Sequence, residues 1–124
     1  MITNIKSIDA GPKIRSTLLE NVQFQIGKHI ADPELSVTKL LRYVGISRTN
    51  LHRKLTRMVG MSATEYIRHL RLQHAAILLV EQTEWSISEI ACEVGFNSQS
   101  YFTRSFIKVF GMCPTAYRKK HHPK

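Results

Sequence analysis

An internal repeat is the feature that most restricts how this chain can fold. When the second half of the sequence is shifted onto the first, with one extra residue at Asn97, the same pattern of helix-starting serines, turn glycines and an outward arginine recurs. The matched pairs are Ser36 and Ser86, Gly45 and Gly95, Ser47 and Ser98, and Arg53 and Arg104. Agreement in caps, turn glycine and apolar face together is hard to obtain from composition alone, so we expect two copies of one structural unit.

The second copy shows the unit most clearly. Ser86 with Glu89 three residues later forms a capping box, and the helix that it opens runs to Val94 before Gly95 permits a left-handed turn. After Ser98 a longer helix places its apolar residues on one face and polar residues on the other. The apolar face is expected to hold Phe102, Phe106, Val109 and Phe110. A short helix, a glycine turn and a longer helix with a polar outer face are typical of a helix-turn-helix motif.

The first copy repeats this order. Ser36 caps a helix through Tyr43, Gly45 makes the turn, and Ser47 begins the longer helix, which Gly60 ends. Its apolar face is expected to hold Leu51, Leu55, Met58 and Val59. Each copy is too small to bury a good core by itself, so the two should share a helix.

The segments around the copies supply that helix. Residues 1–13 show no sustained period and are interpreted as a linker or flexible arm, whereas helical spacing begins at Ile14 and should end near residues 31–33. Ser62 with Glu65 opens the longest predicted helix, over residues 63–82, whose apolar residues form more than one stripe. About twenty residues at 1.5 Å each give roughly 30 Å, close to the ~34 Å turn of B-DNA. Two recognition helices held by this connector could enter successive major grooves.

Charge and composition narrow the function. The chain has 18 Lys and Arg against 9 Asp and Glu, a net charge of +9, which favours nucleic acid or an anionic membrane surface as a partner. The 2 cysteines lack metal-ligand spacing, and the N-terminus lacks a long apolar segment, so we expect a reduced, cytoplasmic protein without a membrane span. We find no phosphate-binding glycine loop, nucleophile elbow or zinc pair in the sequence, and therefore expect no enzyme, no cofactor and no metal.

A dense set of residues matches one known family. The chain resembles the DNA-binding domain of AraC/XylS-type bacterial transcription regulators between about residues 35 and 118. The matching residues are Ile90, Ala91, Gly95, Phe96, Ser98, Tyr101, Phe102, Arg104, Phe106, Lys108, Gly111, Pro114, Tyr117 and Arg118. It departs from the family pattern at Ile107, where lysine is frequent, and at Cys113, where serine or threonine is frequent.

The resemblance implies an all-α fold of seven helices, in which two homeodomain-like helix-turn-helix subdomains are joined by a long connecting helix. Residues 14–124 would form the domain, with subdomain one at 14–61, the connecting helix at 62–82 and subdomain two at 83–120. The implied function is sequence-specific binding of promoter DNA as a transcription regulator, such as an activator, with RNA polymerase as a further partner. The sensing or dimerising module of the family is absent from these residues, and both an excised C-terminal domain and a small stand-alone regulator fit.

The resemblance also implies which side chains contact DNA. The base-reading positions are Thr49, His52 and Arg53 in the first copy and Gln99, Ser100, Thr103 and Arg104 in the second. Arginine can pair with guanine, glutamine with adenine, and a threonine methyl can touch thymine. Charge, rather than the resemblance, makes basic residues candidates for phosphate contacts, with ordinary solvated charges as the alternative: Arg48, Lys54, Arg57, Lys108, Arg118 and Lys119. The helix starts at Ser47 and Ser98 could also point amides at phosphates, although capping alone explains these serines. We rank His52 and Arg53 above Arg104 for specificity, and keep non-specific nucleic-acid binding and a helical protein-interaction module as alternatives.

Overall fold

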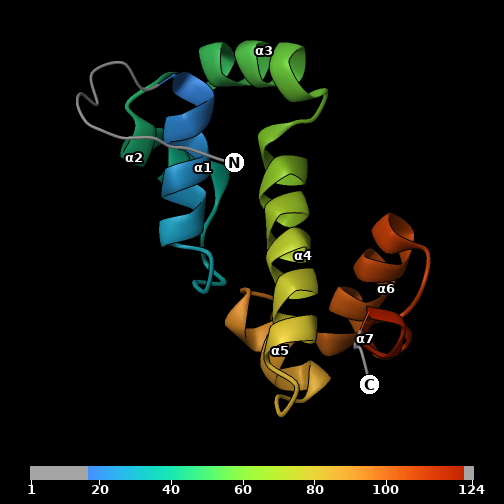
Figure 1. The fold of residues 1–124 in the computed structure, drawn as a ribbon. Coiled ribbons are helices and arrows are strands. Elements are labelled where there is room, and N and C mark those ends of the chain that lie inside the picture. Colours follow the sequence, from blue (N-terminus) through green and yellow to red (C-terminus); the bar gives the residue numbers. More distant parts are fainter. Residues whose placement is uncertain (1–16, 122–124) are drawn as a thin grey trace.

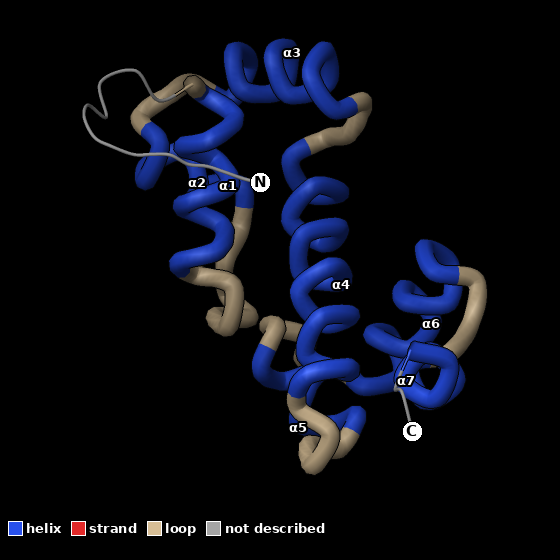
Figure 2. Tube along the Cα trace, in the orientation of Figure 1, coloured by secondary structure: helices blue, strands red, loops and turns tan. Residues whose placement is uncertain are grey.

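The structure, a computed structural model, describes residues 17–121, and this part of the chain forms seven α-helices and no strands (Figures 1 and 2). The predicted linker at residues 1–13 lies outside the described residues. The helices are α1 (Leu18–Lys28), α2 (Val37–Val44), α3 (Arg48–Val59), α4 (Ala63–Glu81), α5 (Ile87–Glu93), α6 (Gln99–Phe110) and α7 (Pro114–His121). The all-α prediction and the order of two helix-turn-helix units around a long helix are confirmed.

The helix boundaries follow from capping chemistry. The predicted serine caps are confirmed, because each serine hydroxyl accepts a hydrogen bond from the backbone N–H three residues later, which the first turn of a helix otherwise leaves unpaired. These caps are Ser36, Ser47, Ser62, Ser86 and Ser98. Gly45, Gly60 and Gly111 then end α2, α3 and α6 in the left-handed conformation.

The first helix is shorter than predicted. Thr17 and Glu20 form a capping box that starts α1 at Leu18, while Ile14 lies outside the described residues. At the other end, His29 leaves the helical conformation at φ −110° and ψ 17°, and its ring stacks on Tyr43 of α2 at 4.1 Å between centroids. The prediction that the helix continues to residues 31–33 is therefore wrong, because the chain turns early toward α2.

Two expected core residues are exposed instead. Met58 of α3 is 43% exposed and Val109 of α6 is 46% exposed, although both lie on the apolar side of their helices by periodicity. The residues at equivalent places one or two turns earlier, such as Leu55 and Phe106, are fully buried. Val59 and Phe110 in the same last turns are partly buried against the two cores, so the covered stripes run through Leu55 and Val59 and through Phe106 and Phe110. Met58 and Val109 lie beside these stripes, and their assignment to the core is wrong.

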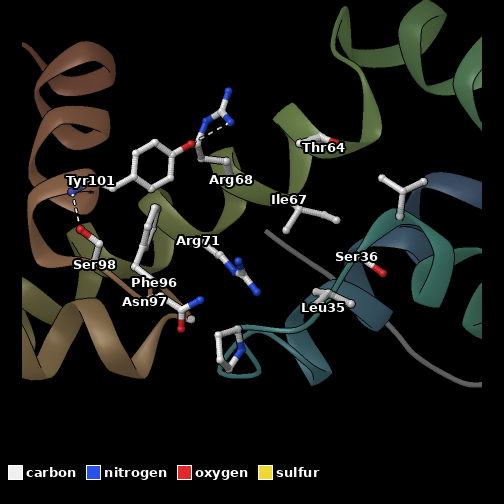
Figure 3. Close-up of a pocket in the computed structure, with 13 residues that line it drawn as sticks. Leu35, Ser36, Thr64, Ile67, Arg68, Arg71, Phe96, Asn97, Ser98 and Tyr101 are labelled. Atoms are coloured by element: carbon white, nitrogen blue, oxygen red, sulfur yellow. Dashed lines mark hydrogen bonds between the residues drawn. The ribbon is translucent and has the colours of Figure 1, made fainter.

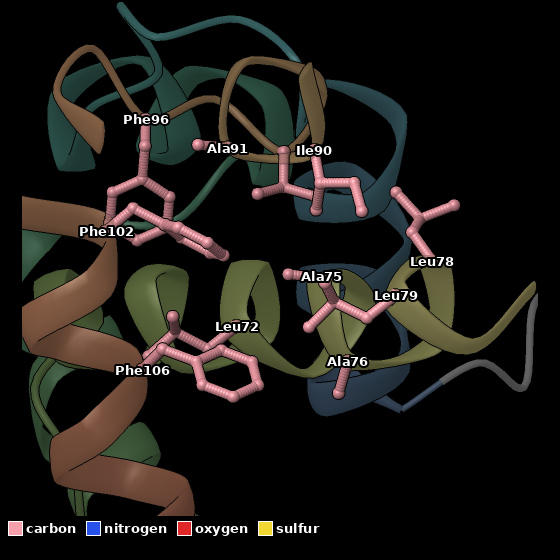
Figure 4. Close-up of a cluster of buried hydrophobic side chains, with 11 residues drawn as sticks. Leu72, Ala75, Ala76, Leu78, Leu79, Ile90, Ala91, Phe96, Phe102 and Phe106 are labelled. Atoms are coloured by element: carbon pink, nitrogen blue, oxygen red, sulfur yellow. The ribbon is translucent and has the colours of Figure 1, made fainter. Parts of the chain in front are cut away.

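Two hydrophobic clusters form the interior, and α4 contributes to both. The first combines α1, α2 and α3 with Ala63, Tyr66 and Ile67 from the beginning of α4. The second combines α5 and α6 with Leu72 and other residues from the remainder of α4 (Figure 4). The members of the second cluster that come from α4 are Leu72, Ala75, Ala76, Leu78 and Leu79. The connecting helix is thus a shared wall of two separate cores, as its double apolar stripe predicted.

The arrangement separates the two long outer helices. In Figure 1, α3 lies beyond the start of α4, α5 lies at the opposite end of α4, and α6 and α7 lie beside α4. With 19 residues, α4 is about 28 Å long at 1.5 Å per residue. None of the helices in residues 17–121 combines the length and apolar character that crossing a bilayer requires.

Candidate nucleic-acid interface

Helix α3 presents its predicted base-reading residues to solvent. Thr49, His52 and Arg53 are all exposed, while Leu51 and Leu55 on the opposite side are buried in the first core. Arg53 is oriented by its own helix, because its Nη2 donates a hydrogen bond to Asn50 Oδ1 at 2.7 Å. A guanidinium held by one amide still has most of its five N–H donors free for a ligand.

The basic residues beside this face are also accessible. Arg48 donates from Nη2 to Thr38 Oγ1 at 3.0 Å, which connects the start of α3 to α2. Lys54 and Arg57 are exposed on the same helix. The Ser47 hydroxyl accepts the Asn50 N–H at 3.2 Å, so it serves first as a helix cap, and the N-terminus that it caps carries partial positive charge.

Helix α6 presents a similar set with one difference. Gln99, Ser100 and Arg104 are exposed, but Thr103 is half-buried. The Ser98 hydroxyl caps the helix by accepting the Tyr101 N–H at 3.1 Å. Phe102 and Phe106, on the inner side, are fully buried in the second core and pack against each other with ring centroids 5.8 Å apart.

Tyr101 is an outward residue that the sequence reasoning left out of the site. Its ring is 42% exposed, its hydroxyl accepts a hydrogen bond from Arg68 Nη1 at 3.2 Å, and the Arg104 guanidinium lies 6.0 Å from its ring centroid. The repeat offered a signal for this position, because Tyr101 aligns with Asn50, a polar residue on the exposed side of α3.

A groove of about 580 Å³ lies between α4 and α6. Arg68 and His69 line it from α4, and Arg104, Lys108 and Val109 line it from α6. Glu65 is the acidic member of this wall. Hydrogen bonds from the Ser62 backbone and side chain, with the charges of Arg68 and Lys108, lower the pKa of Glu65 below its ordinary value. Because Arg68, Arg104 and Lys108 outnumber this one carboxylate, the groove is predominantly cationic at neutral pH.

Arg118 has a different position from the one predicted. Its Nε donates to Leu79 O at 2.9 Å, and its Nη2 donates to Gln82 O at 3.1 Å and to Trp85 O at 2.8 Å. These carbonyls lie at and after the C-terminus of α4, where backbone acceptors lack helical partners and a positive charge is favourable. The guanidinium is half-buried and bonded to these carbonyls, which gives Arg118 a structural role, while its phosphate contact stays a prediction.

The other predicted phosphate contacts remain accessible. Lys108 and Lys119 are exposed at the C-terminal turns of α6 and α7. In residues 17–121, three or more metal-binding side chains do not come together at any point.

The comparisons with known proteins agree with this geometry. Residues 40–120 match a family described as a helix-turn-helix domain. The chain is 34% identical over 89 residues to the HTH-type transcriptional regulator MtrA of Neisseria gonorrhoeae, covering 72% of this chain and 29% of that protein. It is 37% identical over 93 residues to the F1 operon positive regulatory protein of Yersinia pestis, covering 75% of this chain and 31% of that protein.

Solved structures give the same result. An AraC-type regulator from Chromobacterium violaceum superposes with a TM-score of 0.78 at 30% identity, covering 86% of this chain and 93% of that one. The DNA-binding domain of AdpA, solved with a target DNA, superposes with a TM-score of 0.73 at 25% identity, covering 84% and 91%.

The chain therefore belongs to the AraC-type helix-turn-helix family, whose members are DNA-binding transcription regulators, and it is a domain for sequence-specific DNA binding. It spans less than half the length of either curated relative named above.

Proposed function

We propose that α3 and α6 enter successive major grooves on one face of promoter DNA. The observation that carries this proposal is the exposure of equivalent polar faces on both long helices, at the two ends of the shared helix α4. A connector of about 28 Å and a helical turn of about 34 Å are close enough for both helices to reach the same side of a duplex. The net charge of +9 supplies the attraction to phosphates.

We further propose that α3 contributes most of the base discrimination. Arg53 is held by Asn50 beside an exposed His52, and a bidentate pair with guanine is the strongest single contact that these side chains offer. On α6, Gln99, Ser100 and Arg104 read or position bases, Tyr101 joins them, and the half-buried Thr103 contributes less. Phosphate contacts come from Arg48, Lys54, Arg57, Lys108 and Lys119 and from the helix starts at Ser47 and Ser98.

Selection of bound sequences from random duplex DNA tests this function. We expect two short half-sites about one helical turn apart. A pool without sequence preference would contradict the proposal and favour non-specific binding, the alternative that the net charge of +9 supports. Specific complexes should also persist at salt concentrations at which binding to scrambled duplex is lost.

Arg53 and Lys54 form a matched pair for the residue roles, because both are exposed and adjacent on α3. Arg53→Ala should lose about 1–3 kcal/mol on the selected site and relax selectivity at one base pair. Lys54→Ala should weaken binding to all duplexes equally and reduce the salt slope by about one. An equal loss on selected and scrambled DNA for Arg53→Ala would assign Arg53 to phosphate contact instead.

The full regulator is proposed to act as a transcription activator in the bacterial cytoplasm, with RNA polymerase as a second partner. The support for this part is the similarity to a positive regulatory protein. Sensing and dimerisation would be supplied by residues beyond this domain. A promoter-reporter assay with the full regulator, with and without Arg53→Ala, measures the direction of regulation.

A further inference from the structure

The two subdomains have separate cores, so the relative orientation of their recognition helices depends on what joins them. The first cluster and the second cluster are built from different residues, and α4 alone contributes side chains to both. A helix shared along its length leaves bending and rotation of the attached units possible, unless a second contact restrains them. The structure contains such a contact.

This contact is an inter-subdomain junction of Ile30 and Asp32 from the α1–α2 loop, Arg71 from α4 and Gly95 from the α5–α6 turn. Arg71 Nη2 donates a hydrogen bond to Asp32 O at 2.7 Å. Its Nε is buried and has no hydrogen-bond partner in the described part of the chain. Burial lowers the pKa of Arg71, and the charge of Asp32 opposes that shift.

Gly95 completes the junction from the second subdomain. Its φ is +90°, and a Cβ at this position would collide with Ile30 O and would lie 2.8 Å from Arg71 Cζ. The backbone of the second helix-turn-helix motif therefore lies directly against the first subdomain. Gly45, the equivalent turn glycine, has a φ of +78°, but a Cβ there would have no neighbour among the described residues within 4 Å. Gly95 is thus required for close approach as well as for its turn.

The boundary beside the junction is hollowed. A groove of about 540 Å³ lies beside the junction, with Leu35 on one side, Ile67 on α4 and Phe96 on the other side (Figure 3). In Figure 3 the Arg71 side chain lies between the two sides. The junction is thus a direct contact between the two subdomains outside the packing of α4.

We propose that Arg71 is a positioning residue that fixes the orientation of α3 relative to α6, and so determines which half-site spacing the domain accepts. This inference rests on the proposed function. One added base pair moves a half-site by about 3.4 Å along the duplex and rotates it by roughly 34° around the axis, because B-DNA repeats about every 10.5 base pairs. A rigid pair of recognition helices rejects this change, and a loosened pair tolerates it.

Binding to duplexes with altered half-site spacing tests the consequence for DNA. The sites come from the selection with the unmodified domain, and the spacing is changed by one or two base pairs. We expect the unmodified domain to lose affinity about tenfold or more for each base pair by which the spacing is changed. Arg71→Met should make this loss of affinity smaller by about threefold or more. Arg71→Lys, which retains the charge and a donor, should restore part of the loss seen with the unmodified domain.

Gly95→Ala and Gly45→Ala provide a matched pair. Both place a side chain at a positive φ, but only the change at Gly95 meets atoms of the other subdomain. Gly95→Ala should therefore flatten the dependence on spacing, while Gly45→Ala should lower stability and leave that dependence intact. Equal effects of the two substitutions on spacing would overturn the proposal.

A measurement without DNA separates this inference from the proposed function. Spin labels at the exposed positions Thr56 and Ile107, with Cys92 and Cys113 replaced by serine, report the distance between α3 and α6 by double electron–electron resonance. Arg71→Met should broaden the distance distribution, and Gly45→Ala should not. An unchanged distribution in Arg71→Met overturns the positioning role even when DNA selection succeeds, whereas failed selection with a broadened distribution contradicts the proposed function alone.

Discussion

Replacing Arg118 tests whether this arginine supports the fold rather than DNA binding. In Arg118→Met the apolar stem is retained, but the bonds to Leu79 O, Gln82 O and Trp85 O are removed. These bonds join α7 to the C-terminus of α4 and to the loop before α5. The substitution therefore removes the arginine donor from three backbone acceptors in a half-buried region, of which Gln82 O keeps the Trp85 N–H at 3.1 Å.

The expected cost follows from these contacts. An ordinary hydrogen bond contributes about 1 kcal/mol net, and a bond from a charged donor about 1.5–3 kcal/mol. Because the site is half-buried, water can replace part of the lost bonding, so we place the total at about 2–4 kcal/mol of unfolding free energy. For a domain of this size, 1 kcal/mol shifts the melting temperature by roughly 4–8 °C.

Urea unfolding measures the unfolding free energy, and binding to promoter DNA at several salt concentrations measures the salt slope. Lys119→Met is the control, because Lys119 is the next residue and is exposed. We expect Arg118→Met to lower the unfolding free energy and to leave the salt slope unchanged. Lys119→Met should do the reverse and reduce the slope by about one, as loss of a phosphate contact does. Unchanged stability with a reduced slope in Arg118→Met would refute the structural role.

Three further experiments test other parts of the structure. The lowered pKa of Glu65 means that its ionised form stabilises the fold at neutral pH, and that this contribution is lost as the pH falls through the lowered pKa. Glu65→Gln keeps the capping box but removes the titrating group. In this variant the stability, followed by circular dichroism during acid unfolding, should therefore depend less steeply on pH. Phe106→Ala should cost about 3–5 kcal/mol and Leu55→Ala about 2–5 kcal/mol, and hydrogen exchange should show the larger loss of protection within the mutated subdomain. Asn50→Ala frees the Arg53 guanidinium and should weaken specific binding by about 0.5–1.5 kcal/mol, measured against Thr56→Ala on the same helix; no change would show that the bond to Asn50 does not orient Arg53.

Local features of the fold were predictable from the sequence. Serine caps, left-handed glycines and apolar periodicity each involve residues within a few positions of one another, so the pattern of the chain contains them. The repeat then predicted two similar units, and the double apolar stripe of residues 63–82 predicted the shared helix. The exposed faces of α3 and α6 follow directly, because each is opposite a predicted apolar face.

Contacts between distant residues were not predictable in this way. Arg118 binds carbonyls 33 to 39 positions earlier, and Arg71 binds a carbonyl 39 positions earlier. Arginines on helices are usually interpreted as surface charges, and backbone acceptors give no residue-type signal. Periodicity likewise indicates the side of a helix but not how wide a stripe of that side its neighbours cover, which explains the error at Met58 and Val109.

The repeat also conceals a physical difference between its copies. Gly45 and Gly95 occupy the same place in the pattern, yet Gly45 serves its turn alone, while Gly95 lies against the first subdomain. The Tyr101 hydroxyl of α6 bonds to Arg68 of the shared helix α4, whereas the outer face of α3 bonds within its own helix through Asn50 and Arg53 and to α2 through Arg48 and Thr38. Under the proposed function, we therefore expect α6, which is bonded to the shared helix through Tyr101 and Arg68, to set the position of the duplex, and α3 to contribute most of the base discrimination.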